Sequence, residues 1–201
     1  MNGLTIYLLR HGETAWNADN NRYCGRTDIE LTERGLQQAQ AVHEQLAGIE
    51  FNGVYASPLQ RAHITAKIAS GREVTTDPRL IEADFGQWEN KSKEEFIAED
   101  PKLWHDWMQD PATAKAGGTG ETGMDVVLRV DQFFTDLLAK HASGTFMVVA
   151  HNGVNRLYMA YKLGMPLRNY RQIVQLNSAI TQFTLDEKGI FTLQFLNSKL
   201  R

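Results

Sequence analysis

Two short apolar runs that each stop at a histidine constrain the fold of this chain more than any other feature of its sequence. The first run covers residues 4–9 and ends in Arg10 and His11, and the second covers residues 146–150 and ends at His151. Short apolar runs bounded by a turn are typical of strands buried on both faces. In a parallel sheet the carboxyl ends of such strands form the edge where ligands bind. We therefore expect Arg10, His11 and His151 to converge at an anion-binding edge.

Helical and extended patterns alternate along the rest of the chain. Apolar residues recur at helical spacing from Thr32 to Ile49, and Thr32 is suited to cap that helix. The other predicted elements are a strand at 53–56, a helix capped by Ser57 with Pro58 first and Arg61 in its first turn, an extended piece at 73–76, a helix at 122–141, a strand at 145–150 with a helix to Leu163, and a hairpin of 180–185 and 191–196. This alternation predicts an α/β fold of three layers, α/β/α, around a mostly parallel sheet. A length of 201 residues fits a single domain, 1–201.

The segment at 91–120 differs from its surroundings. It is polar with scattered aromatic residues, which indicates short helices lying over the sheet, and we expect it to form a lid. Three glycines among residues 117–120 predict a flexible break at its far end. Trp104 and Trp107, three residues apart, are more typical of packing than of a ligand site. The alternative is that they line the mouth of the pocket.

Charge and cysteine content exclude several classes of partner. The net charge of −3 gives no general attraction to nucleic acid or to an anionic membrane, so a basic site must be local. The single cysteine, Cys24, has no internal disulfide partner, and the N-terminus lacks the pattern of a secretory signal. No apolar run approaches the roughly 18 residues that span a bilayer. These features predict a cytoplasmic protein without nucleic-acid or membrane partners.

A series of blocks resembles the signatures of the histidine phosphatase superfamily, the phosphoglycerate mutase-like group. The blocks are residues 9–17 (LRHGETAWN), 24–25 (CG), 31–35 (LTERG), 57–62 (SPLQRA), 80–82 (LIE) with 86–89 (GQWE), and 150–153 (AHNG), all in the family's order. An isolated Arg-His-Gly is weak evidence for the family, but the ordered series of blocks spans most of the chain. The resemblance implies the phosphoglycerate mutase-like fold and, in a chain this compact, the phosphatase subgroup.

The resemblance also implies roles for individual residues. His11 is the expected nucleophile, and a neutral imidazole in a rigid turn at a strand end suits that chemistry. His151 is expected to support the phosphoryl group in transit, which works best if it is protonated. The forked donors of arginine match phosphate oxygens. The residues expected to bind phosphate are Arg10, Asn17, Arg61, Gly12 and Asn152, and those expected to contact the substrate are Cys24 and Gly25.

A phosphate ester needs an acid that protonates its leaving oxygen. Glu82 matches the family's acid position, and Asp84 ranks second; Glu13 and Glu89 are further carboxylates that the sequence alone leaves open. Asn90 stands where many relatives have glycine, which leaves the local turn uncertain but not the chemistry. The remaining histidines show no spacing that would bind a metal, and the glycines at 117–120 lack the lysine and hydroxyl of a nucleotide-binding loop. We therefore expect neither a metal nor a cofactor.

These residues predict a phosphomonoesterase that hydrolyses small phosphate esters through a phosphohistidine on His11. The alternatives are a cofactor-dependent phosphoglycerate mutase and a non-catalytic module that binds phosphate ligands. Mutases of the family carry a longer insertion, whereas His151 follows Glu82 by only 69 positions (151 − 82). A short, mobile lid should admit water to the intermediate. The expected partner is a small phosphorylated metabolite. The sequence leaves open whether the protein forms a homodimer.

Overall fold

The computed structural model describes residues 3–198, which form a sheet of six strands flanked by helices. The strands are β1 (Gly3–Arg10), β2 (Gly53–Ala56), β3 (Thr75–Thr76), β4 (Ser143–Ala150), β5 (Ile180–Asp186) and β6 (Phe191–Ser198). Their order across the sheet is β3-β2-β4-β1-β5-β6. The first four are parallel, and the hairpin of β5 and β6 adds two antiparallel strands at one edge. The predicted α/β fold with a mostly parallel sheet is confirmed.

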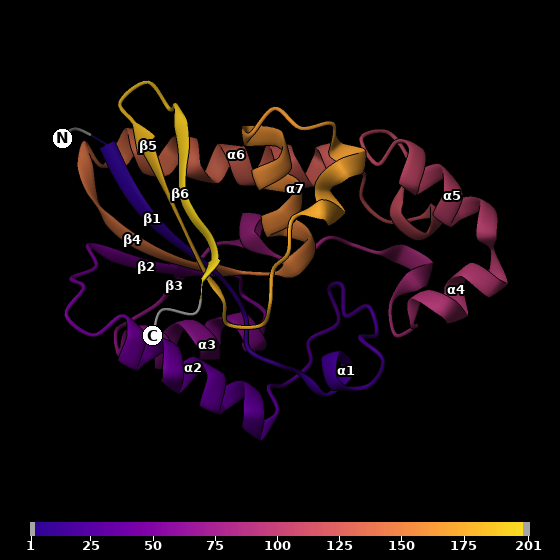
Figure 1. Cartoon of the computed structure of the whole chain (residues 1–201), viewed down its shortest axis with the longest axis horizontal. Helices are drawn as coiled ribbons and strands as arrows, with labels where there is room; N and C mark the ends of the chain where they lie inside the picture. Colours follow the sequence, from indigo (N-terminus) through magenta and orange to yellow (C-terminus); the bar gives the residue numbers. More distant parts are fainter. Residues whose placement is uncertain (1–2, 199–201) are drawn as a thin grey trace.

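Helices cover both faces of this sheet (Figure 1). The α-helices are α1 (Ala15–Ala18), α2 (Glu33–Gln45), α3 (Gln60–Ser70), α4 (Lys93–Glu99), α5 (Pro101–Gln109), α6 (Gly123–Lys140) and α7 (Asn152–Lys162). Short 3₁₀ segments are η1 (Pro78–Leu80), η2 (Gly86–Trp88), η3 (Ala116–Gly118) and η4 (Leu167–Gln172). Leu8 of β1 packs with α6 and α7 on one face, and the adjacent Leu9 packs with α2 and α3 on the other. Residues of β1 alternate between buried and half-buried as far as Tyr7, and the strand is buried on both faces from Leu8 to Arg10.

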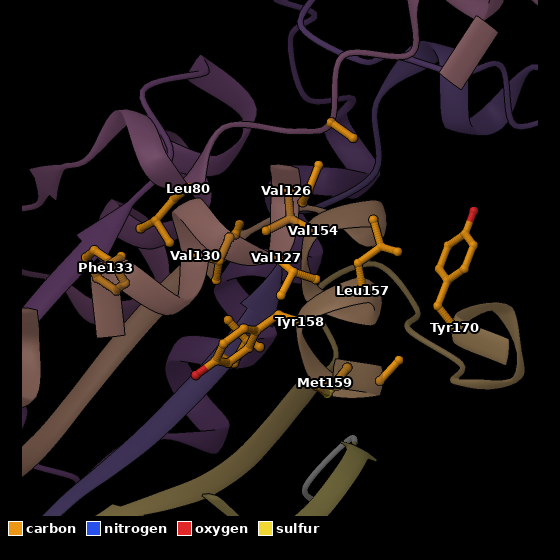
Figure 2. Close-up of a cluster of buried hydrophobic side chains, with 14 of the residues drawn as sticks. Leu80, Val126, Val127, Val130, Phe133, Val154, Leu157, Tyr158, Met159 and Tyr170 are labelled. Atoms are coloured by element: carbon orange, nitrogen blue, oxygen red, sulfur yellow. The ribbon is translucent and has the colours of Figure 1, made fainter. Parts of the chain in front are cut away.

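The larger core cluster lies between the sheet and the pair α6 and α7. Figure 2 shows Val126 and Val130 of α6 beside Val154 and Leu157 of α7, with all four side chains at most 2 % exposed. This packing holds the first turn of α7 directly after His151. The helix carries its buried residues on the face toward α6 and the sheet, so the start of α7 has a fixed position relative to β4.

Local cap chemistry sets two of the helix starts as the sequence predicts. The hydroxyl of Thr32 accepts a hydrogen bond from Gly35 N at 3.0 Å, and Thr122 forms a capping box with Asp125. The predicted start of α3 at Ser57 and Pro58 is wrong, because this helix begins at Gln60.

The reason for the later start of α3 is a contact from elsewhere in the chain. Ser57 N donates to Val149 O and so extends the contact between β2 and β4 by one residue. The carboxylate of Asp28 then accepts the hydrogen bond of Gln60 N at 2.9 Å and caps the helix. Arg61 still lies in the first turn, as predicted.

The predicted lid at 91–120 comprises α4, α5 and η3, which lie away from the sheet beside η4 (Figure 1). The prediction of a flexible glycine break at its end is wrong, because these glycines permit close packing. A Cβ on Gly117 would lie 2.2 Å from Phe85 O, and one on Gly120 would lie 2.1 Å from Asp84 O. Asn90 has a φ of +62°, which asparagine tolerates in the place of glycine.

Aromatic rings hold the same segment together. Trp88 stacks on Phe96 with ring centroids 4.8 Å apart, and Trp104 meets both rings. Trp107 is buried and donates from its indole nitrogen to the Tyr170 hydroxyl at 3.2 Å. Both tryptophans therefore pack, and neither lines the pocket described below. Within the described part of the chain, no helix has the length and apolar character needed to cross a membrane.

Candidate active site

The register of the two central strands brings the two histidines together. Arg10 pairs with Ala150 in the parallel ladder of β1 and β4, so His11 and His151 follow at the same level. Their ring centroids are 5.1 Å apart, and His11 is 3 % exposed while His151 is fully buried. The convergence expected from the two apolar runs is therefore present.

The backbone around His11 fixes its ring. Nδ1 of His11 lies 2.6 Å from the carbonyl oxygen of Gly12. Because a carbonyl can only accept, Nδ1 is assigned the proton, and Nε2 then carries the lone pair. Gly12 N donates to the Thr65 hydroxyl at 3.0 Å, and a Cβ on Gly12 would lie 2.5 Å from Gly35 O. Glycine is thus required here for the close approach of α2.

Both histidines are held in the neutral form. Burial, followed by the charges of Arg61 and Arg10, holds the pKa of His11 well below its ordinary value of 6.5. Burial, Arg61 and His11 lower the pKa of His151 in the same direction. These effects disfavour the protonated form of His151 that the resemblance leads us to expect.

Arg10 lies at the base of the pocket and is held from behind. Its Nη1 donates to Gln175 O at 2.9 Å, and burial lowers the pKa of Arg10 to about 10, so it stays charged near neutrality. Asn155 donates to both Leu9 O and the Gln175 side chain, and Gln175 donates to the Thr181 hydroxyl. This buried chain of hydrogen bonds sets the direction of Arg10. No sequence pattern indicated Asn155 or Gln175, because their partners come from other segments.

Arg61 is fully buried beneath the loop at 24–27. Its Nη1 and Nη2 donate to Thr27 O and Gly25 O, both at 2.7 Å, and Nε has no partner among the described residues. Arg61 therefore lies near both histidines and acts on their pKa values, but it is not among the side chains that line the pocket. Gly25 is fixed by Arg61 and also lies outside the lining.

Of the four carboxylates that the sequence left open, Glu82 alone lines the pocket. Its Oε1 accepts from Val154 N at 3.1 Å and from Ala83 N at 2.9 Å, and its Oε2 accepts from Gly153 N at 3.2 Å. The carboxylate thus lies at the positive N-terminal end of α7. Arg129 of α6 donates to the carbonyl oxygens of Ile81 and Glu82 and anchors the backbone.

The other three carboxylates have structural partners. Asp84 faces Arg26 at 3.8 Å, and Glu13 accepts from the Thr32 hydroxyl at 3.1 Å. Glu89 accepts from Arg26 N and Thr27 N and holds the loop at 24–27 in place. These groups stabilise the loops around the pocket.

The lining of the pocket combines predicted residues with others that the sequence did not indicate. The predicted site residues that line it are Arg10, His11, Asn17, Cys24, Glu82 and Asn152. Several buried polar atoms without a partner within residues 3–198 belong to the lining or to the neighbouring Arg61 and His151. They include Nε of Arg10, Nε of Arg61, both ring nitrogens of His151 and Oδ1 of Asn152. Buried polar groups are nearly always paired, so this concentration indicates a site for a polar ligand.

Sequence reasoning missed the other residues that line the pocket. They are Asn21, Arg22, Tyr23, Phe85, Gly153, Arg156, Tyr170 and Arg171. Arg156 lies in α7 only five positions after His151, so that helix could have drawn attention to it. Arg171 in η4 had no sequence signal. Among the described residues, no group of three or more histidine, cysteine or acidic side chains is placed to hold a metal ion.

Comparison with known proteins gives a family match over nearly the whole chain. The family model described as histidine phosphatase superfamily (branch 1) matches residues 6–199. Phosphoserine phosphatase 1 of Hydrogenobacter thermophilus is 31 % identical over 91 % of this chain and 87 % of its own length. A probable phosphoglycerate mutase, GpmB, of Erwinia tasmaniensis is 31 % identical over 89 % of this chain and 84 % of its own.

A solved structure also matches over nearly the whole chain. The crystal structure of a putative alpha-ribazole-5'-P phosphatase from Escherichia coli superposes with a TM-score of 0.86 at 33 % identity, covering 98 % of both chains.

Proposed function

The chain belongs to the histidine phosphatase superfamily and is a phosphatase of small phosphate esters, and we propose that it works through a phosphohistidine formed on His11. The observation that carries this proposal is the pair of buried histidines whose ring centroids lie 5.1 Å apart, with His11 and Arg10 lining the pocket. A neutral imidazole is a nucleophile, whereas a protonated one is not.

The orientation of His11 supports its role as the nucleophile. With Nδ1–H donated to Gly12 O, the lone pair of Nε2 is free to attack phosphorus. The Nε2–P bond forms as the bond from phosphorus to the ester oxygen breaks. Arg10, Asn17 and Asn152 line the same pocket and supply donors for the phosphoryl oxygens. Arg61 contributes its charge and its free Nε from beneath the loop.

Glu82 is the proposed acid and base. In the first step its carboxyl group gives a proton to the leaving ester oxygen, which departs as an alcohol. In the second step the Glu82 carboxylate takes a proton from the water that attacks phosphorus, and the N–P bond breaks to release inorganic phosphate and His11. Its place in the pocket wall, which Asp84, Glu13 and Glu89 lack, supports this assignment.

His151 is proposed to hold the phosphoryl oxygens. Both of its ring nitrogens are buried without a partner in the described chain, so a bound oxygen would satisfy one of them. A phosphate dianion places negative charge beside the ring and opposes the effect of Arg61 and His11 on its pKa. We infer that His151 gains its proton when the substrate binds and not before.

Trapping the phosphoenzyme tests the proposal. His11→Ala should abolish turnover and remove an acid-labile, base-stable phosphohistidine that rapid quench detects in the unsubstituted protein. The matched control is His105→Ala, because His105 is exposed on α5 and lies outside the pocket. Turnover above a trace level in His11→Ala, or no phosphohistidine in the unsubstituted protein, would contradict the mechanism.

The role of Glu82 has its own test. Glu82→Gln should lower kcat for an alkyl phosphate by roughly 10² to 10⁴, because the alkoxide cannot leave without a proton. The loss should be much smaller for p-nitrophenyl phosphate, whose leaving group is already stable as an anion. Equal losses on both esters would show that Glu82 binds or supports the site without transferring a proton.

A further inference from the structure

The pocket contains more positive charge than a single phosphoryl group explains. Beyond Arg10 at the base, the side chains of Arg156 and Arg171 line the same space. We propose that Arg156, Arg171 and Tyr23 form a second anion site, and that the preferred substrate is a phosphate monoester carrying a carboxylate. This inference rests on the proposed phosphatase function for the phosphoryl end and adds the recognition of the other end.

Arg156 is held in place with one nitrogen left over. Its Nε donates to Tyr170 O at 3.3 Å and its Nη2 donates to Arg171 O. Its guanidinium carbon also lies 5.3 Å from the centre of the Tyr170 ring. Nη1 makes no hydrogen bond within residues 3–198, and the side chain is half-buried in the pocket wall. A fixed guanidinium with a free donor loses little freedom when it binds an anion.

Arg171 has the same character. Its Nη1 donates to the hydroxyls of Tyr23 at 3.0 Å and of Tyr170 at 3.4 Å. The guanidinium lies over the Trp104 ring at 5.0 Å, so its plane is fixed by packing. Nε and Nη2 have no hydrogen-bond partner in the described chain, and these two nitrogens form one edge of the guanidinium fork. A carboxylate can accept both of them in the bidentate arrangement.

Tyr23 completes the site as a donor. Its hydroxyl accepts the hydrogen bond from Arg171, so the phenolic proton is free for another partner. Burial raises the pKa of Tyr23 to about 12, so the proton is retained throughout the working pH range. The side chain lines the pocket beside the two arginines.

No carboxylate of the described chain forms an ion pair with these arginines. Neither Arg156 nor Arg171 has an acidic oxygen within 4.0 Å, whereas Arg22, which also lines the pocket, is paired with Asp19 and Glu95. Burial lowers the pKa of Arg156, which shows that its charge is poorly solvated. Half-buried charge without a counter-ion is costly, so a ligand that brings the missing negative charge gains affinity.

The two anion sites differ in depth. Arg10 and His11 are at most 7 % exposed, while Arg156, Arg171 and Tyr23 are half-buried in the same pocket. The phosphoryl group therefore occupies the base, next to the nucleophile, and the carboxylate faces the outer arginines.

A matched pair of esters tests the proposal. The two substrates differ at one carbon, which is a carboxylate in 3-phosphoglycerate and a neutral CH₂OH group in glycerol 1-phosphate. The unsubstituted protein should show a kcat/KM about tenfold or more higher for 3-phosphoglycerate, since hydrogen bonds to a charged group contribute a factor of roughly 10 to 100. Equal values for the two esters would overturn the proposal, whatever any variant does.

Substitution of Arg171 assigns the preference to a residue. Arg171→Met should lower kcat/KM for 3-phosphoglycerate about 10- to 100-fold and change that for glycerol 1-phosphate less than about twofold. Arg171→Lys should keep part of the preference, since it retains the charge without the fork. Arg168→Met is the control, because Arg168 is exposed on the same 3₁₀ segment, η4, and does not line the pocket. Equal loss on both esters in Arg171→Met would refute a carboxylate contact.

Binding measurements separate this inference from the phosphatase proposal. Calorimetry on His11→Ala, which cannot form the intermediate, should show tighter binding of 3-phosphoglycerate than of glycerol 1-phosphate, and Arg171→Met in that background should remove the difference. If the unsubstituted protein turned over neither ester, the proposed function would fail while calorimetry still decided on the second anion site. If turnover occurred without any binding preference, the second site alone would be refuted.

Discussion

Gly153→Ala should impair catalysis while leaving the fold intact, because the added methyl group meets the carboxylate of Glu82. Gly153 lies in the first turn of α7 in an ordinary helical conformation, so alanine fits the backbone there. A Cβ at this position would lie 2.8 Å from Oε1 of Glu82 and 3.2 Å from the Phe85 ring. Carbon and oxygen in contact need about 3.3 Å, so the carboxylate must move by roughly 0.5 Å.

A shift of that size is enough to disturb proton transfer. Catalytic groups work within about 0.5 Å of their productive position, and a displacement of this order costs about 10- to 100-fold in rate. The carboxylate would also stretch its hydrogen bonds to Val154 N and Gly153 N. Alanine is favoured over glycine in helices by up to about 1 kcal/mol, which offsets part of the clash. We therefore expect the free energy of unfolding to change by about 1 kcal/mol or less.

Steady-state kinetics with two leaving groups would show the effect. In Gly153→Ala, kcat for an alkyl phosphate should fall about 10- to 100-fold, and kcat for p-nitrophenyl phosphate should fall much less. In the Glu82→Gln background the same substitution should cost little more, because the group it displaces no longer transfers a proton. An unchanged kcat for the alkyl phosphate, or an equal further loss in the Glu82→Gln background, would refute the reasoning.

The free energy of unfolding should depend on pH through the two buried histidines, because their pKa in the folded state lies below the unfolded value near 6.5. Their contribution is fully present above that pH and is lost below it, by up to about 1.4 kcal/mol per pH unit for each histidine. Urea unfolding at pH 7.5 and 5.5 measures this, and a slope that persists unchanged in His11→Ala/His151→Ala would exclude the histidines as its cause. A chelator should leave the rate unchanged, because cationic side chains carry the charge of the phosphoryl group; a loss restored by Mg²⁺ or Zn²⁺ would contradict this. Gly120→Ala should lower the free energy of unfolding by about 1 to 3 kcal/mol, since its Cβ would lie 2.1 Å from Asp84 O, and a calorimetric melting curve equal to that of the unsubstituted protein would rule out the close approach. With 3-phosphoglycerate and the 2,3-bisphosphate, release of inorganic phosphate should outpace formation of 2-phosphoglycerate, because no residue of 91–120 lines the pocket to exclude water; faster isomerisation would favour a mutase.

The sequence by itself determined the central strands, the place of the two histidines and the family. Residues 146–150 are apolar on both faces and buried throughout, and residues 4–9, apolar except for Thr5, form the parallel strand beside them. Thr32 and Thr122 cap their helices through neighbours a few positions away. Features of this kind depend on residues close in the chain, so a single sequence expresses them.

Tertiary structure alone decided which polar side chains face the pocket. Arg61 matches a signature of the family, yet its terminal nitrogens are held by the carbonyl oxygens of the loop at 24–27. Arg171 matches no signature and lines the pocket, because Tyr23 and Trp104 fix its guanidinium. Glu82 faces the pocket and the nearby Asp84 does not, because backbone amides at the start of α7 hold the carboxylate of Glu82.

Dependence on distant segments of the chain also explains the two local predictions that were wrong. The glycines at 117–120 permit the close approach of residues 84–88, and Asp28 sets the start of α3 from more than thirty positions away in the chain. Spacing and composition report conformational preference within one segment. The direction of a side chain, and the need for a missing Cβ, depend on which distant segment lies against it, and only the packed structure determines that contact.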